Sequence, residues 1–265
     1  MIDNFRFKDF YNINDLLDIM RCLRSPGGCP WDAEQTHDSI KKNFIEETYE
    51  VIEAINKNDS TLLKEELGDV LLQVVFHSQM EAEHGVFDFN NVVDGICNKL
   101  IDRHPHVFGK VSVGSVDDVL NNWDNIKRKS KNQKSSTSAM KSVPRELPAL
   151  MRSTKIQQKA KSSGFDWPDI NGAVEKLEEE ISELKTAIFE NDADSSFEEL
   201  GDVLFSVVNV SRFLNCDAEE SLTSATDKFV DRFSRVEELS EKHNIDMNNT
   251  SLEELDKLWD KAKKS

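Results

Sequence analysis

The chain of 265 residues has few of the residues that cross-link or interrupt a fold, with four cysteines, six prolines and ten glycines. The cysteines (Cys22, Cys29, Cys97 and Cys216) form no Cys-x-x-Cys pair and no regular framework. This spacing argues against a zinc site and against a small disulfide-stabilised secreted fold. We therefore expect a reduced protein in the cytoplasm. The scarcity of glycine and proline favours long, uninterrupted helices.

Long apolar runs and an excess of positive charge are also lacking. No segment approaches the ~18–20 apolar residues of a membrane span, and residues 1–17 lack the basic-then-apolar pattern of a signal peptide. The 33 basic residues are outnumbered by 50 acidic ones, which gives a formal net charge of -17. Because a general nucleic-acid binder needs a basic surface, we expect neither a nucleic acid nor a membrane as partner. A small polyanionic substrate remains compatible, since a bound metal ion can reverse the local charge.

Several common catalytic motifs are absent. The sequence contains no G-x-x-x-x-G-K-[ST] phosphate loop and no G-x-S-x-G serine motif, and no Cys/His nucleophile arrangement stands out. Gly109-Lys110 is followed by Val111 and lacks the earlier glycine of a phosphate loop. These absences argue against a P-loop NTPase and against a serine or cysteine hydrolase.

Helical periodicity dominates the chain. Apolar residues recur at helical spacing in 43–56 and 62–80, and the Asn-Lys-Asn-Asp stretch at 56–59 suits a turn between two helices. No segment alternates convincingly as a strand, and 107–116, the best candidate, is predicted to be a loop. The sequence predicts an all-α fold.

The sequence also repeats itself. Residues 46–75 and 179–208 align without a gap at an offset of 133, with 16 identities in 30 positions. Such a long period indicates two tandem homologous domains rather than a solenoid. A polar, Ser- and Lys-rich stretch separates the two copies. We predict an N-terminal helical domain at 1–127, a linker at 128–149 and a C-terminal helical domain at 150–265.

The repeated helices carry paired carboxylates. Residues three or four apart share a helix face, so Glu47 and Glu50 lie on one face of the first helix, and Glu66 and Asp69 lie on one face of the second. If the two helices pack antiparallel, four carboxylates converge, and they require either protons or a cation. Mg²⁺ prefers oxygen ligands and retains waters for a phosphate-bearing partner, so the motif predicts a Mg²⁺ site, with Mn²⁺ as the alternative.

Each copy also contains a Lys-x-x-x-Arg pair and a Trp-x-x-x-Lys pair. Both residues of each basic pair lie on one side of a later helix and suit phosphate oxygens, whereas an indole beside a lysine suits a base and a phosphate. Taken alone, such pairs are more often surface ion pairs or packing anchors. Their recurrence in the same order in both copies favours function, although duplication explains part of it. The pairs are Lys99/Arg103, Trp123/Lys127, Lys228/Arg232 and Trp259/Lys263.

In this combination the motifs resemble the MazG family of nucleoside triphosphate pyrophosphohydrolases, as do the segments CPWDAEQTHDSI (29–40) and GFDWPD (164–169). The resemblance implies an all-α fold with a four-helix bundle around Mg²⁺, usually formed by homodimerisation. It also implies hydrolysis of a nucleoside triphosphate between the α and β phosphates, to a monophosphate and pyrophosphate. In two-domain members the C-terminal copy is the main active one.

The resemblance also assigns residues. The implied Mg²⁺ ligands are Glu180, Glu183, Glu199 and Asp202 in the second copy and Glu47, Glu50, Glu66 and Asp69 in the first. The implied nucleotide contacts are Lys176, Lys228, Arg232, Trp259 and Lys263, with Lys99, Arg103, Trp123 and Lys127 in the first copy. Asn43 replaces Lys176 in the first copy, although Lys42 is adjacent. Glu179 and Glu46, the extra carboxylate of each pair, are candidates to position or deprotonate the attacking water.

Two alternatives remain open at this point. One is a related pyrophosphohydrolase of narrow specificity, acting on one deoxynucleotide or on a phosphoribosyl nucleotide. The other is a helical module that binds a nucleotide or a partner protein without turnover. The intact carboxylates of both copies favour an enzyme over a binding module.

Overall fold

A computed structural model describes most of the chain, namely residues 7–115, 118–119, 122–123, 126 and 135–263. Its regular secondary structure is helical, with no strand in the described residues, so the all-α prediction is confirmed. The chain divides into two compact units, 1–127 (unit 1) and 128–265 (unit 2). Among the helices of the described ranges, none combines the length and apolar character needed to cross a bilayer.

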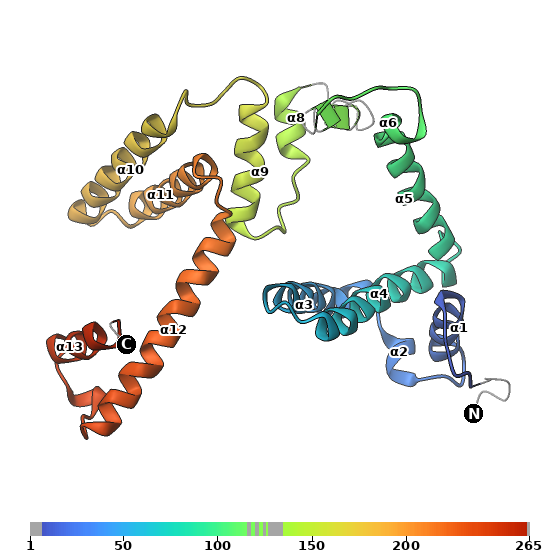
Figure 1. Ribbon diagram of the computed structural model, residues 1–265, viewed down its shortest axis with the longest axis horizontal. Coiled ribbons are helices and arrows are strands. Elements are labelled where there is room, and N and C mark those ends of the chain that lie inside the picture. The colour runs from blue at the N-terminus through green and yellow to red at the C-terminus, as the bar shows by residue number, and fades with distance from the viewer. Residues whose placement is uncertain (1–6, 116–117, 120–121, 124–125, 127–134, 264–265) are drawn as a thin grey trace. The chain divides into compact units, whose positions relative to one another are not determined.

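Unit 1 is built around a helical hairpin. Its helices are α1 (Ile13–Arg24), α2 (Pro30–Glu34), α3 (His37–Asn56), α4 (Ser60–Glu83), α5 (Phe89–Arg103) and α6 (Pro105–Phe108). The two long helices α3 and α4 lie side by side, α1 packs on α4, and α5 leaves from the end of α4 (Figure 1). The core joins α1, α3 and α4 through Met20, Ile40, Val75, Phe76 and Met80.

Unit 2 contains a second hairpin of the same kind. Its helices are α8 (Ser136–Lys141), α9 (Ala149–Lys161), α10 (Ile170–Glu190), α11 (Ala193–Phe213), α12 (Ala218–Lys242), the 3₁₀ turn η1 (Met247–Asn249) and α13 (Leu252–Ala262). Helices α10 and α11 form the hairpin, α9 packs on α11, and α13 packs on α12 (Figure 1). A small core of Val236, Leu258 and Ala262 joins α12 to α13.

The same turn connects the two helices of each hairpin. Asn58 and Asn191 adopt left-handed backbone conformations with φ of 53° and 55°, which asparagine tolerates better than most residues. The next residue caps the second helix: the Asp59 carboxylate accepts from Thr61 N–H at 2.9 Å and that of Asp192 accepts from Ser195 N–H at 3.1 Å. Helix caps of this kind satisfy backbone donors that lack an intrahelical partner. The predicted turn at 56–59 is therefore confirmed.

Two segments differ from the sequence-based expectation. Within 128–149, predicted as a linker, α8 packs on α9, and Ala139 of α8 and Val143 two residues after its end are buried. Burial of two small apolar residues against a neighbouring helix outweighs the weak helix preference of the surrounding serines. Within 107–116, predicted as a loop, the first two residues complete α6, and 109–115 contain no helix. The domain boundaries themselves remain a prediction.

Candidate active site

In unit 1 the hairpin brings carboxylates from two helices together. Glu47 of α3 and Glu66 and Asp69 of α4 each offer an oxygen within 4.8 Å of the others. Glu50 lies one turn along α3 from Glu47. Burial, a hydrogen bond with Glu50 and the negative charges around it raise the pKa of Glu47. Burial and the charges of Glu50, Asp69 and Glu65 likewise raise the pKa of Glu66. Among the described residues, no cation contributes to either shift.

Unit 2 repeats this arrangement at the corresponding positions. Glu180 of α10 and Glu199 and Asp202 of α11 lie with their carboxylate oxygens within 4.8 Å of one another. Only 6% of Glu180 is exposed. Burial and the neighbouring charges, including those of Glu183 and Glu180, raise the pKa of Glu199. In both units the second glutamate of the α3 or α10 motif (Glu50 or Glu183) is not among the three closest carboxylates, but it contributes to the local field.

A lysine distinguishes the second cluster from the first. The Lys176 ammonium lies 2.8 Å from Oε1 of Glu179 and 2.8 Å from Oε1 of Glu180. These two hydrogen bonds raise the pKa of Lys176 well above its ordinary value, so the lysine stays charged. Asn43 occupies the equivalent place in unit 1, and the adjacent Lys42 is solvent-exposed. Unit 2 therefore neutralises part of its cluster with its own side chain.

The basic residues predicted to bind nucleotide lie on other helices. In unit 1, Lys99 and Arg103 lie on the last turns of α5, and the Arg103 guanidinium stacks on the Trp123 ring at 5.0 Å. Lys127 lies outside the described residues. Within the described part of unit 1, neither Lys99 nor Arg103 forms an ion pair with the acidic cluster.

In unit 2 the corresponding group forms where α13 packs on α12. The Trp259 ring contacts Phe229 of α12 with ring centroids 5.1 Å apart, beside Lys228 and within one turn of Arg232. Lys263 pairs with Asp260 at 3.0 Å. The helix α13 packs on α12 rather than on the α10–α11 hairpin. In each unit, the described residues therefore form an acidic group and a separate basic, aromatic group, with no ion pair between the two.

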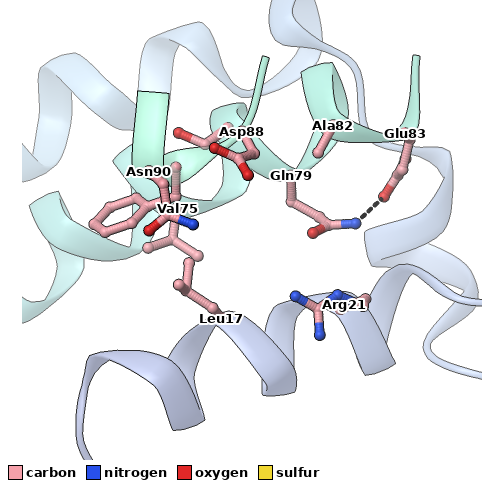
Figure 2. A pocket seen from close by; sticks show the side chains of 10 residues that line it. Leu17, Arg21, Val75, Gln79, Ala82, Glu83, Asp88 and Asn90 are labelled. Atoms are coloured by element: carbon pink, nitrogen blue, oxygen red, sulfur yellow. Dashed lines mark hydrogen bonds between the residues drawn. The ribbon is translucent and has the colours of Figure 1, made fainter. Parts of the chain in front are cut away.

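Unit 1 also has a hollow of about 330 Å³ between α1, α4 and the start of α5 (Figure 2). Gln79 donates to Glu83 at 3.0 Å across one side of it, and Arg21 lies opposite. Its lining on α4 begins at Val75, six residues beyond Asp69. At about 1.5 Å per residue this is well past the acidic cluster, so the hollow does not adjoin the site.

Sequence analysis missed a polar group that links the start of α3 to the second half of α4. The Nδ1 atoms of His37 and His77 lie 2.7 Å apart, and His37 Nε2 lies 2.8 Å from a carboxylate oxygen of Glu81. Burial lowers the pKa of His77. This group could have been predicted only from the register of the hairpin. If Glu47 lies opposite Glu66 on antiparallel helices, then His37 lies close to His77.

Comparisons with known proteins agree with one another. The family model of the MazG nucleotide pyrophosphohydrolase domain matches residues 35–108 and 171–237, which include both acidic clusters. The chain is 48% identical over 249 residues to the nucleoside triphosphate pyrophosphohydrolase/pyrophosphatase MazG of Thermotoga maritima, covering 94% of each chain. It is 43% identical over 255 residues to the nucleoside triphosphate pyrophosphohydrolase of Escherichia coli K12, covering 95% of this chain and 97% of that one.

Proposed function

The chain belongs to the MazG family of nucleotide pyrophosphohydrolases, and from this we propose that it hydrolyses nucleoside triphosphates between the α and β phosphates, giving a monophosphate and pyrophosphate. The relatives that match almost their entire length are named for this activity. The observation that carries the proposal is the pair of carboxylate clusters, each within 4.8 Å, in the two segments that match the family.

The clusters suit a divalent cation. All their donors are carboxylate oxygens, which Mg²⁺ prefers, and the raised pKa values of Glu47, Glu66 and Glu199 signal unneutralised negative charge. We assign Mg²⁺ or Mn²⁺ to Glu180, Glu199 and Asp202 with Glu183 nearby, and to Glu47, Glu66 and Asp69 with Glu50 nearby. Such an ion neutralises charge on phosphate oxygens and lowers the pKa of a bound water.

The chain's own residues position the water and the phosphates. The Lys176 ammonium binds Oε1 of Glu179 and Oε1 of Glu180, and these two contacts fix the orientation of both carboxylates. Glu179 is exposed beside the buried Glu180, and we assign to its carboxylate the role of accepting a proton from the attacking water. Glu46 is the exposed equivalent in unit 1.

We assign the basic groups to the same reaction through a second copy of the chain. On α12 the exposed residues Leu222, Phe229, Val230 and Phe233 follow helical spacing and form an apolar stripe. Exposed apolar surface of this kind marks an interaction site. In a homodimer, covering this stripe would bring Lys228, Arg232, Trp259 and Lys263 toward the partner's carboxylates. Lys99, Arg103, Trp123 and Lys127 are the unit 1 counterparts.

The first experiment identifies the products. The purified protein is incubated with a panel of ribo- and deoxyribonucleoside triphosphates, with and without Mg²⁺, and the products are resolved by ion exchange. We expect monophosphate and pyrophosphate only in the presence of metal. Diphosphate with orthophosphate would refute the assigned bond, and the absence of product from every nucleotide would favour a binding module.

A second experiment tests the homodimer. Glu180→Gln removes an acidic group and Arg232→Ala a basic one, and each variant alone is expected to be inactive. If the groups meet across a two-fold interface, mixed dimers regain one intact site, and freely exchanging chains recover about a quarter of wild-type activity. If both groups act within one chain, mixing restores nothing.

Location follows from the cysteines. All four, including the exposed Cys97 and Cys216, are free thiols. Free, accessible cysteines suit a reducing compartment. We therefore propose a cytoplasmic location, which fractionation of cells that produce the protein would test.

A further inference from the structure

A cavity of about 450 Å³ in unit 2 lies between α9, the loop that precedes α10, and α11. Three aromatic side chains line it, Phe165 and Trp167 from the loop and Phe205 from α11. Two amide side chains, Gln157 of α9 and Asn209 of α11, also line it. Aromatic walls with a few polar groups are typical of small-molecule sites. We call this cavity the Gln157 pocket.

The Gln157 side chain has an unused hydrogen-bond acceptor. Only 6% of the residue is exposed. Its Nε2 donates to the backbone carbonyl of Phe205 at 2.8 Å, and because a carbonyl can only accept, this bond fixes the orientation of the amide. Its Oε1 is buried and has no hydrogen-bond partner among the described residues. A buried acceptor left unpaired costs free energy, so a ligand with an N–H group directed at Oε1 would be favoured.

The corresponding place in unit 1 is filled by apolar residues. Gly27 and Gly164 both have φ of +84° and lie three residues beyond the ends of α1 and α9. Aligning the helices on these glycines places Met20 of unit 1 where unit 2 has Gln157. Met20 is 1% exposed and belongs to the unit 1 core. A methionine packed in the core has thus been exchanged, between the two copies, for a glutamine beside a cavity.

On α11, which forms the opposite wall of the cavity, an apolar residue of unit 1 is also replaced by an amide in unit 2. At the offset of 133, Phe76 of unit 1 corresponds to Asn209 and Gln79 to Arg212. Phe76 packs in the core at 4% exposure, whereas Asn209 lines the cavity and accepts from Arg212 at 2.7 Å. Arg212 also binds both carboxylate oxygens of Asp166 and so ties the aromatic loop to α11. Two positions that hold packed apolar side chains in unit 1 therefore hold amide side chains that line a cavity in unit 2, which favours a ligand.

The lining of the Gln157 pocket on α11 begins one helical turn beyond the acidic cluster. Phe205 and Asn209 follow Asp202 by three and seven residues, so all three share one face of α11. At about 1.5 Å per residue, the pocket extends from about 4.5 Å to about 10 Å along the helix from the cluster. A ligand whose phosphates lie at Asp202 can therefore extend its other end into the pocket.

We propose that the Gln157 pocket, and not the Trp259 indole, holds the heterocyclic base of the substrate, an inference that rests on the proposed nucleotide hydrolysis. Phe165 and Trp167 stack on the ring, and Gln157 Oε1 accepts from an N–H group on its edge. The Asn209 amide, whose oxygen is engaged by Arg212, presents its NH₂ group to an adjacent ring nitrogen or carbonyl. The pocket would thus select a planar heteroaromatic ring that carries a hydrogen-bond donor next to an acceptor.

The test converts the pocket of unit 2 to the composition of unit 1. Gln157→Met removes the acceptor and fills space with the residue that unit 1 uses, so the fold is retained, which thermal unfolding checks. We expect the KM for nucleoside triphosphates to rise about tenfold or more, because the variant loses one buried hydrogen bond to the base and fills part of the cavity. Hydrolysis of ribose 5-triphosphate, which lacks a base, should be unchanged. Gln79→Leu, an equivalent change at the hollow of Figure 2, is the matched control and should leave both substrates unaffected.

Each other outcome overturns the assignment in an identifiable way. An unchanged KM for nucleotides in Gln157→Met refutes the base site. An equal loss on nucleotides and on ribose triphosphate indicates a structural disturbance, and a change in the sedimentation coefficient indicates that a second copy covers the pocket. Absence of monophosphate and pyrophosphate from the wild-type protein is a different failure, that of the proposed function itself.

Discussion

In the described part of unit 1 no basic side chain forms an ion pair with the carboxylates of the acidic cluster, whereas in unit 2 the Lys176 ammonium bonds to two glutamates, one of them in the cluster. The helix that packs behind the hairpin also differs, because it contributes Met20 to the apolar core in unit 1 and Gln157 to the lining of a cavity in unit 2. The carboxylate geometry is the same in both. The difference teaches that the arrangement of the carboxylates does not distinguish the copies, whereas the groups around them do, and those of unit 2 are the ones that we propose to bind the nucleotide.

The largest expected effect comes from the carboxylates. Glu180→Gln should lower kcat/KM about 100-fold or more, because it removes the buried carboxylate that we propose as a metal ligand. Glu47→Gln, the same change in unit 1, should retain most of the activity. Steady-state kinetics with Mg²⁺ held in excess measure both.

Glu178→Gln is the control for this pair, because Glu178 is an exposed glutamate on α10 outside the cluster. It should behave as the wild type does. Equal losses in Glu47→Gln and Glu180→Gln would show that both units carry turnover, and the comparison between them would then fail.

A smaller effect is expected from the lysine. Lys176→Met should lower kcat about tenfold, since Glu179 and Glu180 lose the group that directs their carboxylates. Lys185→Met, at an exposed position on the same helix, is the matched control. Full activity in Lys176→Met would mean that the ion pair only stabilises α10.

The metal-free protein should also respond to pH. The folded-state pKa values of Glu47 and Glu66 are raised above the unfolded value of about 4.5, so the folded state binds more protons. Their contribution to stability is therefore present below that pH and is lost as the pH rises through the folded-state pKa values. Thermal unfolding followed from pH 4.5 to 7.5 should show this loss without metal, and Mg²⁺ should offset it.

Single substitutions show how much each carboxylate cluster contributes to the thermal unfolding midpoint of the metal-free protein. Glu66→Gln should raise the metal-free unfolding midpoint at pH 7 more than Glu199→Gln, because Lys176 already offsets part of the charge in unit 2. A larger gain from Glu199→Gln would contradict this account of the difference between the units.

The parts of this structure that depend on local sequence could be predicted. Helical periodicity and the Asn-Asp turn specify each hairpin, and i,i+3 spacing places Glu66 with Asp69 on one face of α4. The two hairpins together imply that carboxylates from paired helices meet. Chemistry that depends on one helix alone, or on two helices joined by a short turn, is accessible from the sequence.

Features that need contacts between distant segments could not be predicted. Gln157 meets the Phe205 carbonyl across 48 residues, and nothing local in α9 indicates an unpaired acceptor. The segment 136–141 reads as linker because of its serines, yet Ala139 packs on α9. In both cases tertiary packing outweighs local preference.

The smallest expected effect concerns the His37–His77 pair of unit 1, which unit 2 lacks at the aligned positions. Unit 2 has Ile170 and Val210 in place of His37 and His77 at the offset of 133, so the double variant His37→Ile/His77→Val gives unit 1 the residues of unit 2. Because burial lowers the folded-state pKa of His77 from 6.5, its contribution to stability is present above about pH 6.5 and is lost as the pH falls through the folded-state pKa.

At pH 7.5 the two changes should alter the free energy of unfolding by about 1 kcal/mol or less, because apolar packing replaces the exchanged hydrogen bonds. Between pH 6.5 and 5 the wild type should lose stability faster than the variant, as measured by urea unfolding at each pH. Glu81, which loses its partner His37, keeps its access to solvent, since its side chain is 24% exposed. Parallel pH profiles would show that the carboxylate clusters, present in both units, control the acid response of unit 1 and that its histidine pair does not.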